Sequence, residues 1–169
     1  MSISFPTKRK NRKIDNILFL DYDGVVNTKM WSLYQGKWEY RYNFPCDGKV
    51  NNEQAVQWVS EFCEKYKYDI VVISSWRTED NYADCLINAG LRKNIRVLGR
   101  VSPSKSKSDA ISDYIKDHGE IRRYLIFDDE YISKYYRHLV RCNPTRGFSE
   151  VEYNKAAKKH MKMGAKHNG

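Results

Sequence analysis

The sequence predicts an α/β fold built around a mostly parallel sheet of five strands. Two observations support this prediction: short apolar runs that favour β-structure recur along the chain, and segments with helical periodicity separate them. Continuous apolar runs suit strands that are buried on both faces, as in a parallel sheet. With 169 residues, of which 41% are hydrophobic, the chain is long enough to bury one such core as a single domain.

Five short apolar runs are candidates for the strands. Residues 14–20 end in the apolar letters ILFL, and residues 69–74 read DIVVIS. Three shorter candidates follow at 95–98, 124–127 and 139–142. Apolar residues spaced three or four positions apart predict helices at 52–66, 79–89, 106–118 and 149–163. Strands that alternate with helices in this way are typical of parallel sheets joined by right-handed crossovers.

Residues 28–48 interrupt the alternation and predict a β-hairpin, or flap. Aromatic residues recur there at every second position: Trp38, Tyr40, Tyr42 and Phe44. The Gln35-Gly36 pair before them suits a tight turn. The flap would lie over the end of the first strand. Its aromatic side chains would either pack the flap onto the body of the protein or stack on a nucleobase or another planar group, and the two roles are compatible.

The composition is that of a soluble globular protein, with 30% charged and 14% aromatic residues. The apolar runs fall short of the ~18 residues of a membrane span, and IDNILFL after the basic N-terminal patch is too short for a signal peptide. We therefore expect a cytoplasmic protein without membrane contact. The four cysteines, Cys46, Cys63, Cys85 and Cys142, lack the clustered spacing of a zinc site, so we expect reduced, mostly buried thiols.

The net charge of +9 lies in the two ends of the chain. Residues 1–13 and 155–169 each carry five basic residues and no acidic one, which leaves twenty basic against 21 acidic residues in 14–154, a net charge of −1. We expect a basic tail at 1–13, a catalytic domain at 14–154 and a basic helix end or tail at 155–169. Such ends either bind nucleic acid through counterion release or keep the protein soluble.

Polar residues follow the predicted strands at their carboxyl ends, where ligands bind in open α/β sheets. In chain order they are Asp21 and Asp23, Ser74 and Ser75 with Arg77, Lys105 and Lys107, and Asp128 and Asp129. An Asp-Gly turn or a helix-capping serine explains any one of them alone. Their place after successive strands instead predicts one shared site.

Carboxylates, hydroxyls and a lysine in one site suit phosphoryl transfer through an aspartyl phosphate. A carboxylate can attack phosphorus and form a covalent intermediate. A second acid can protonate the leaving oxygen and later activate a water molecule. Because carboxylates repel a phosphate dianion, a cation must lie between them, and Mg²⁺ is the ion that we expect. A hydroxyl and an ammonium group would hold the remaining phosphate oxygens.

These residues resemble the four motifs of the haloacid dehalogenase (HAD) superfamily, over roughly residues 14–148. LFLDYDG resembles the first motif, which implies that Asp21 is the nucleophile and Asp23 the general acid/base. VVISS resembles the second motif and implies Ser74 as a phosphate ligand, with Ser75 beside it. KSDAI resembles the third motif and implies Lys107 as the phosphate lysine.

Lys105 fits the third motif less well, because the helical pattern follows Lys107 directly. LIFDDE resembles the fourth motif and implies Asp128 and Asp129 as metal ligands, together with Asp21 and Asp23. Which of Asp128 and Asp129 would touch the metal directly stays open.

The resemblance also implies the architecture, a Rossmann-like three-layer sandwich in which the flap is a minimal cap over an open site. An acidic residue at Asp23 favours a phosphatase. The strings SSWR and DDE and the pair Gly147-Phe148 look most like small HAD domains associated with nucleic-acid end repair. The implied substrate is then a nucleotide or a polynucleotide terminal phosphate.

Several alternatives stay open. The substrate could be a small metabolite, and the phosphoryl acceptor could be a group other than water. Outside the enzymes, the chain could be a HAD fold that binds nucleic acid without turnover. Arg77 and, with less support, Arg146 would either contact a phosphate with both ends of the guanidinium group or form a structural salt bridge. Trp76 would either pack in the protein or stack on a substrate.

Overall fold

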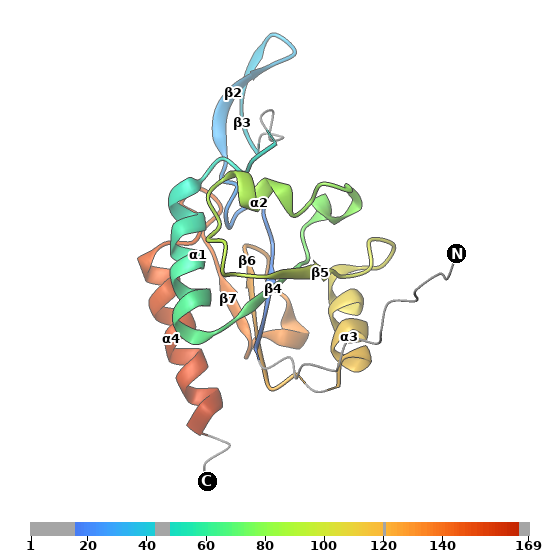
Figure 1. Ribbon diagram of the computed structural model, residues 1–169. Helices are drawn as coiled ribbons and strands as arrows, with labels where there is room; N and C mark the ends of the chain where they lie inside the picture. Colours follow the sequence, from blue (N-terminus) through green and yellow to red (C-terminus); the bar gives the residue numbers. More distant parts are fainter. Residues whose placement is uncertain (1–15, 43–47, 120, 166–169) are drawn as a thin grey trace, which may run out of the picture.

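Five parallel strands form the central sheet of the computed structural model, which describes residues 16–42, 48–119 and 121–165 (Figure 1). The strand order is β5-β4-β1-β6-β7, and each neighbouring pair is parallel. The strands are β1 Asn16–Leu20, β4 Asp69–Val72, β5 Val97–Arg100, β6 Arg123–Asp128 and β7 Leu139–Arg141. The predicted α/β class and the parallel five-stranded sheet are confirmed.

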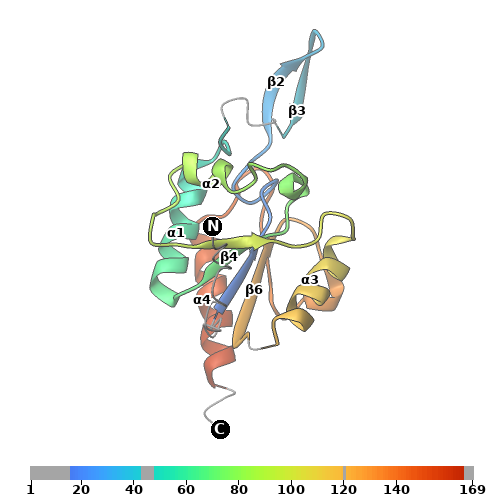
Figure 2. The same ribbon diagram turned by 45° about the vertical axis from the view of Figure 1, so that its right-hand side comes forward.

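Helices cover both faces of the sheet and make the predicted three layers (Figures 1 and 2). The helices are α1 Glu53–Tyr66, α2 Asp84–Asn88, α3 Lys107–Asp117 and α4 Glu150–Ala165, with 3-10 turns η1 Ser75–Thr78 and η2 Ser133–Tyr135. Alternate residues of β1 enter different cores: Leu18 and Leu20 belong to the cluster that α1 and α4 complete, and Ile17 and Phe19 to the cluster with α3. Because β1 is fully buried on both faces, it reads as a continuous apolar run.

Side-chain caps fix where two of the helices begin. The Asn52 side chain accepts a hydrogen bond of 2.9 Å from the Ala55 amide at the start of α1. The Ser106 hydroxyl accepts one of 3.2 Å from the Asp109 amide, so that α3 begins at Lys107. These bonds satisfy amides that have no partner within the helix. The cap at Ser106 therefore sets the position of Lys107.

The predicted helix at 79–89 is wrong for its first half, since α2 covers Asp84–Asn88 alone. The preceding residues form turns, in which the amide of Tyr82 bonds the carbonyl of Glu79. The guanidinium group of Arg100 on the neighbouring strand also donates to the Glu79 carbonyl, at 3.1 Å. Tertiary hydrogen bonds thus hold carbonyl groups that a continuous helix would use. The predicted strand at 95–98 begins two residues later, because the pairing of the edge strand β5 starts at Val97.

The predicted hairpin is present as β2 Met30–Tyr34 and β3 Lys37–Arg41, which pair in antiparallel fashion and extend beyond the body of the domain (Figures 1 and 2). Gln35 and Gly36 form the turn with φ angles of 48° and 77°. Two successive residues at positive φ are typical of the turn whose twist matches paired strands. The expectation that the hairpin aromatics pack onto the body is wrong for Trp38 and Tyr40, which are 68% and 43% exposed.

Other predictions concern the ends of the chain and the cysteines. The basic tail at 1–13, Phe44, Cys46 and residues 166–169 lie outside the described residues. Cys63, Cys85 and Cys142 are free and buried, as predicted.

In the described ranges, no helix combines the length and apolar character needed to cross a membrane. The segment 155–165 belongs to α4, whose carboxyl end lies at the opposite end of the molecule from the hairpin (Figure 1).

Candidate active site

The sheet register brings the predicted strand-end residues to one edge. Leu20 at the end of β1 pairs with Val72 of β4 and with Phe127 of β6. Asp21 therefore follows β1 at the level where Asp128 completes β6, and the Asp21 amide donates a hydrogen bond of 3.0 Å to the Phe127 carbonyl. The backbone pairing of three buried strands fixes these positions.

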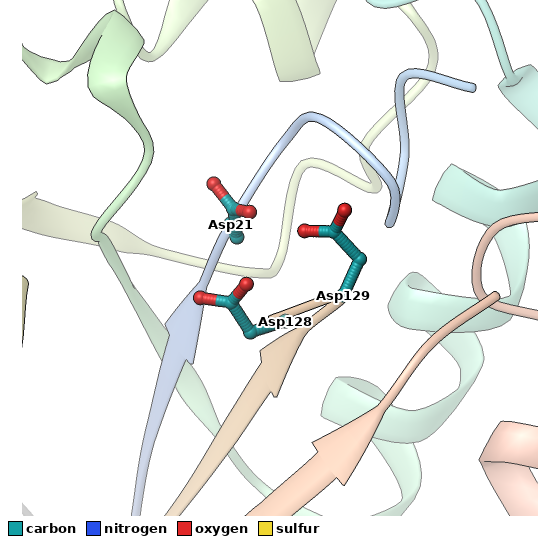
Figure 3. Close-up of side chains that lie close together, drawn as sticks. All are labelled: Asp21, Asp128 and Asp129. Carbon is teal, nitrogen blue, oxygen red and sulfur yellow. The ribbon is translucent and has the colours of Figure 1, made fainter. Parts of the chain in front are cut away.

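Three carboxylates converge at this edge (Figure 3). One oxygen from each of Asp21, Asp128 and Asp129 lies within 4.8 Å of the other two. Asp21 is 4% exposed and Asp128 is fully buried. Asp128 is also held by the amide of Glu130, which donates to its Oδ1 atom at 2.9 Å. Two of the three carboxylates are thus buried and Asp129 is half-buried, and a backbone hydrogen bond preorganises Asp128.

Lys107 supplies the positive charge beside this group. Its Nζ atom lies 2.7 Å from Oδ2 of Asp128, 3.5 Å from Oδ2 of Asp21 and 3.8 Å from Oε2 of Glu130. Lys105, the other candidate, instead forms an ion pair with Asp113 at the exposed side of α3. Of the two lysines, the structure places Lys107 in the site and Lys105 outside it.

The environment raises the pKa values of Asp21, Asp128 and Lys107, for different reasons. Burial raises the pKa of Asp21 well above its ordinary value, the Asp128 carboxylate raises it further, and Lys107 opposes both. Burial likewise raises the pKa of Asp128, against the attraction of Lys107. Burial alone would lower the pKa of Lys107, but the charges of Asp21 and Asp128 outweigh it and the pKa is raised. The site therefore needs positive charge to keep its carboxylates ionised.

Asp23 lies next to the acidic group but is not part of it among the described residues. Its Oδ1 atom accepts a hydrogen bond of 2.8 Å from the Asn27 amide group, and its Oδ2 atom accepts one of 3.4 Å from the Trp76 indole. Burial raises the pKa of Asp23, and these two hydrogen bonds lower it in part. The two aspartates of the DxDG sequence thus have different surroundings.

Ser74 follows β4 and is fully buried at the same edge. Its hydroxyl oxygen accepts a hydrogen bond of 3.3 Å from the Trp76 amide, so the hydroxyl proton can be donated to a phosphate oxygen. Ser75, at the start of η1, is exposed.

Arg77 is buried, and its guanidinium group bonds backbone carbonyls from two segments. It donates to Ile73 at 3.0 Å and Ser74 at 3.1 Å, and to Ser102 at 3.2 Å and Lys105 at 3.0 Å. Among the described residues Arg77 forms no ion pair, so the structural salt bridge predicted as one alternative is not seen there, and a phosphate contact stays a prediction. Arg77 instead ties the end of β4 to the segment that precedes α3.

Arg146 pairs with the buried Glu152 at 2.6 Å, which is the structural alternative predicted for it. Trp76 is 8% exposed, as expected for packing, and its indole also reaches Asp23.

Two neighbours of Asp129 could not be assigned from the sequence. The Tyr42 hydroxyl donates a hydrogen bond of 3.0 Å to Oδ2 of Asp129 and joins the hairpin to the site. Gly24 has a φ angle of +82°, and a Cβ atom there would lie 2.4 Å from the Asp129 side chain. The aromatic alternation of the flap and the glycine of DxDG were the available signals, but neither identifies the partner residue.

The donor set fits a hard divalent cation such as Mg²⁺. It consists of carboxylate oxygens alone, and magnesium prefers oxygen ligands at about 2.1 Å, so that opposite ligands lie about 4.2 Å apart. One oxygen from each of Asp21, Asp128 and Asp129 lies within 4.8 Å of the other two, which is compatible with ligands of a single ion. The acidic group can therefore hold a metal ion.

The comparisons with known proteins agree with this geometry. The family model described as the HAD domain in Swiss Army Knife RNA repair proteins matches residues 17–153. These residues include every strand from β2 to β7 and each of the strand-end groups described above. No curated protein matches the chain.

Proposed function

This chain belongs to the family of HAD domains found in Swiss Army Knife RNA repair proteins, and from that membership we propose that it is a Mg²⁺-dependent phosphatase that removes terminal phosphates from RNA. The observation that carries the proposal is the convergence of Asp21, Asp128 and Asp129 beside Lys107. A structural ion pair alone does not need three clustered carboxylates beside one lysine, whereas a metal-dependent phosphoryl-transfer site uses groups of these kinds.

We assign the nucleophile to Asp21. A carboxylate oxygen of Asp21 attacks phosphorus, the bond between phosphorus and the leaving oxygen breaks, and an aspartyl phosphate forms. When bound, the metal ion would neutralise charge between the Asp21, Asp128 and Asp129 carboxylates and the phosphate. Ser74 and Lys107 would bind the phosphate oxygens and stabilise the charge that develops on them.

We assign proton transfer to Asp23 rather than a place in the metal site. Its raised pKa favours the protonated form, which can donate a proton to the leaving alkoxide. The resulting carboxylate then removes a proton from water, which attacks the phosphorus of the aspartyl phosphate. This step releases inorganic phosphate and restores Asp21. The hydrogen bonds from Asn27 and Trp76 orient the Asp23 carboxyl group throughout.

The test is a substrate panel assayed for phosphate release. RNA oligonucleotides with a 5′- or 3′-phosphate, mononucleotides and sugar phosphates are incubated with Mg²⁺ or with EDTA. We expect phosphate to be released from RNA ends in the presence of Mg²⁺, and we expect EDTA to abolish this release. No release from any substrate in Mg²⁺ would favour the alternative of a HAD fold that binds nucleic acid without turnover. Release from sugar phosphates alone would overturn the assignment of RNA as the substrate.

A further inference from the structure

One face of the β2–β3 hairpin carries apolar side chains alone. The register pairs Trp31 with Tyr40 and Leu33 with Trp38, and directly opposite residues in an antiparallel pair share a face. All four are exposed, from 43% for Tyr40 to 68% for Trp38. The rings of Trp31 and Tyr40 lie side by side, with their centroids 5.5 Å apart. We call these four residues the aromatic face.

The aromatic face does not serve the stability of the domain. The hairpin forms a two-stranded sheet of its own, separate from the central sheet, and extends away from it (Figure 2). Isolated two-stranded hairpins are marginally stable, and large apolar side chains that remain in water mark interaction sites. Three of the four side chains are aromatic rather than aliphatic, which suits stacking on planar groups better than a purely hydrophobic contact.

The charge of the hairpin is complementary to a polyanion. Residues 29–42 carry Lys29, Lys37 and Arg41 against Glu39, a net charge of +2, whereas the 14–154 segment as a whole is at −1. Lys29 lies 5.4 Å from the centroid of the Tyr42 ring at the base of the hairpin. Lys37 and Arg41 lie on the face opposite the aromatic face, where the Arg41 guanidinium is 3.8 Å from the centroid of the Tyr34 ring. Cations beside aromatic rings are the combination that binds single-stranded nucleic acid.

The hairpin is connected to the candidate active site. Its base is held by the hydrogen bond from Tyr42 to Asp129, an acidic residue of the metal group. Both views show the hairpin rising from the end of the molecule where the strands β1 and β6 finish (Figures 1 and 2). The lysine-rich carboxyl end of α4 lies at the other end (Figure 1), so it is the hairpin that adjoins the site.

We propose that the aromatic face binds single-stranded RNA by base stacking, next to the terminal phosphate that enters the active site. The position of that phosphate rests on the proposed function; the stacking itself does not. Each strand of the hairpin has five residues and spans about 17 Å. Stacked nucleotides advance by about 3.4 Å each, so the length of the hairpin matches a run of about five nucleotides. The two cross-strand pairs of the aromatic face lie about 7 Å apart along the strands, which suits stacking of about two or three of those bases. Unpaired bases are required, because a duplex hides the faces of its bases.

The test measures the affinity for a fluorescein-labelled, unphosphorylated RNA pentanucleotide by fluorescence anisotropy. Trp31→Ala and Trp38→Ala are each expected to weaken binding about fivefold or more, the loss associated with one stacked base. The matched control is Tyr136→Ala, which removes another exposed ring (53%) outside the hairpin and should leave the affinity unchanged. Affinity for the wild-type protein should rise with RNA length up to about five nucleotides and then level off.

A second readout separates this proposal from the proposed function. For the tryptophan variants, the ratio of kcat/KM on a phosphorylated pentanucleotide to kcat/KM on a mononucleotide should fall. Binding that depends on Trp31 and Trp38 without phosphate release would uphold the aromatic face and overturn the phosphatase. Phosphate release from RNA with wild-type affinity in both variants would overturn the aromatic face alone.

Two further outcomes would overturn the proposal. One is equal affinity for the pentanucleotide and a blunt duplex of the same length. The other is a wild-type dimer that sedimentation shows to dissociate in the Trp31→Ala and Trp38→Ala variants while RNA affinity stays unchanged. In that case the aromatic face would bind a second copy of the chain.

Discussion

The ammonium group of Lys107 lies 2.7 Å from the Oδ2 atom of the buried Asp128. Asp21 lies 3.5 Å from the same ammonium group and Asp129 completes the acidic group, so these three carboxylates together with the one lysine carry a charge of −2 when all are ionised. Like charges at this spacing raise one another's pKa unless cations compensate. A divalent ion would balance the group, and this relationship connects the predictions on the nucleophile, the metal and the lysine.

Asp21→Asn should abolish phosphate release while the protein keeps its fold. An amide cannot act as the nucleophile, and we expect turnover to fall by at least about 10³-fold. The change removes one of several clustered negative charges, so the melting temperature should stay equal or rise. Circular dichroism melting and a phosphate-release assay measure the two effects. Asp117→Asn, at an exposed position on α3, is the control. An Asp21→Asn protein with substantial turnover would contradict the mechanism.

Asp128→Asn and Asp129→Asn should each raise the Mg²⁺ concentration needed for half-maximal activity, by about tenfold or more, since each removes a charged oxygen ligand. Mg²⁺ should also raise the melting temperature of the wild-type protein, because an ion that binds only the folded state stabilises it. Both variants should show a smaller rise. An unchanged Mg²⁺ dependence in both variants would place the metal elsewhere.

Lys107→Met should lower kcat/KM by about 10²-fold, since it removes a preorganised positive charge from the transition state. Lys105→Met changes the same residue type two positions earlier, where the lysine pairs with Asp113 on the exposed side of α3. It should stay within about twofold of the wild-type protein, because exposed pairs contribute little. Steady-state kinetics on one mononucleotide compares the two variants. Equal losses would show that the position of Lys107 beside Asp128 has no special role.

Arg77→Lys should lower the free energy of unfolding by about 2 kcal/mol or more, because a lysine cannot bond carbonyls on two segments with one planar group. Urea denaturation measures the loss. Arg92→Lys is the matched control, since its surface pairs with Glu61 and Glu64 should contribute little to the free energy of unfolding. A variant of Arg77 that kept its stability but lost phosphate release would show that the guanidinium acts on the phosphate directly.

The acidic residues and the lysine of the site could be predicted from the sequence alone. Buried parallel strands produce continuous apolar runs, and parallel strands end at one edge, so the pattern places Asp21 and Asp128 close together. The helical pattern directly after Lys107 favoured it over Lys105, and the structure adds the reason, since the Ser106 cap makes α3 begin at Lys107.

The contacts that orient these residues could not be predicted in the same way. Tyr42 is 87 positions from Asp129, and Trp76 is 53 positions from Asp23, so no local pattern relates them. The exposure of the hairpin aromatics could not be predicted from the sequence for a similar reason. Alternation predicts that residues share a face, but whether that face is covered depends on what the rest of the chain places against it.

Gly24→Ala should disturb the metal site more than backbone strain alone explains. A Cβ atom at Gly24 would lie 2.4 Å from the Asp129 side chain, so Asp129 must move and its hydrogen bond from Tyr42 must lengthen or break. Gly36→Ala is the matched control, because Gly36 has a similar φ angle (+77° against +82°) but no neighbouring atom within 4 Å. Both variants should lose about 1 kcal/mol of stability from the left-handed backbone. Gly24→Ala alone should also need more Mg²⁺ for half-maximal activity on a mononucleotide. If the two variants need the same Mg²⁺ concentration, the close approach of Gly24 to Asp129 does not position the metal ligand.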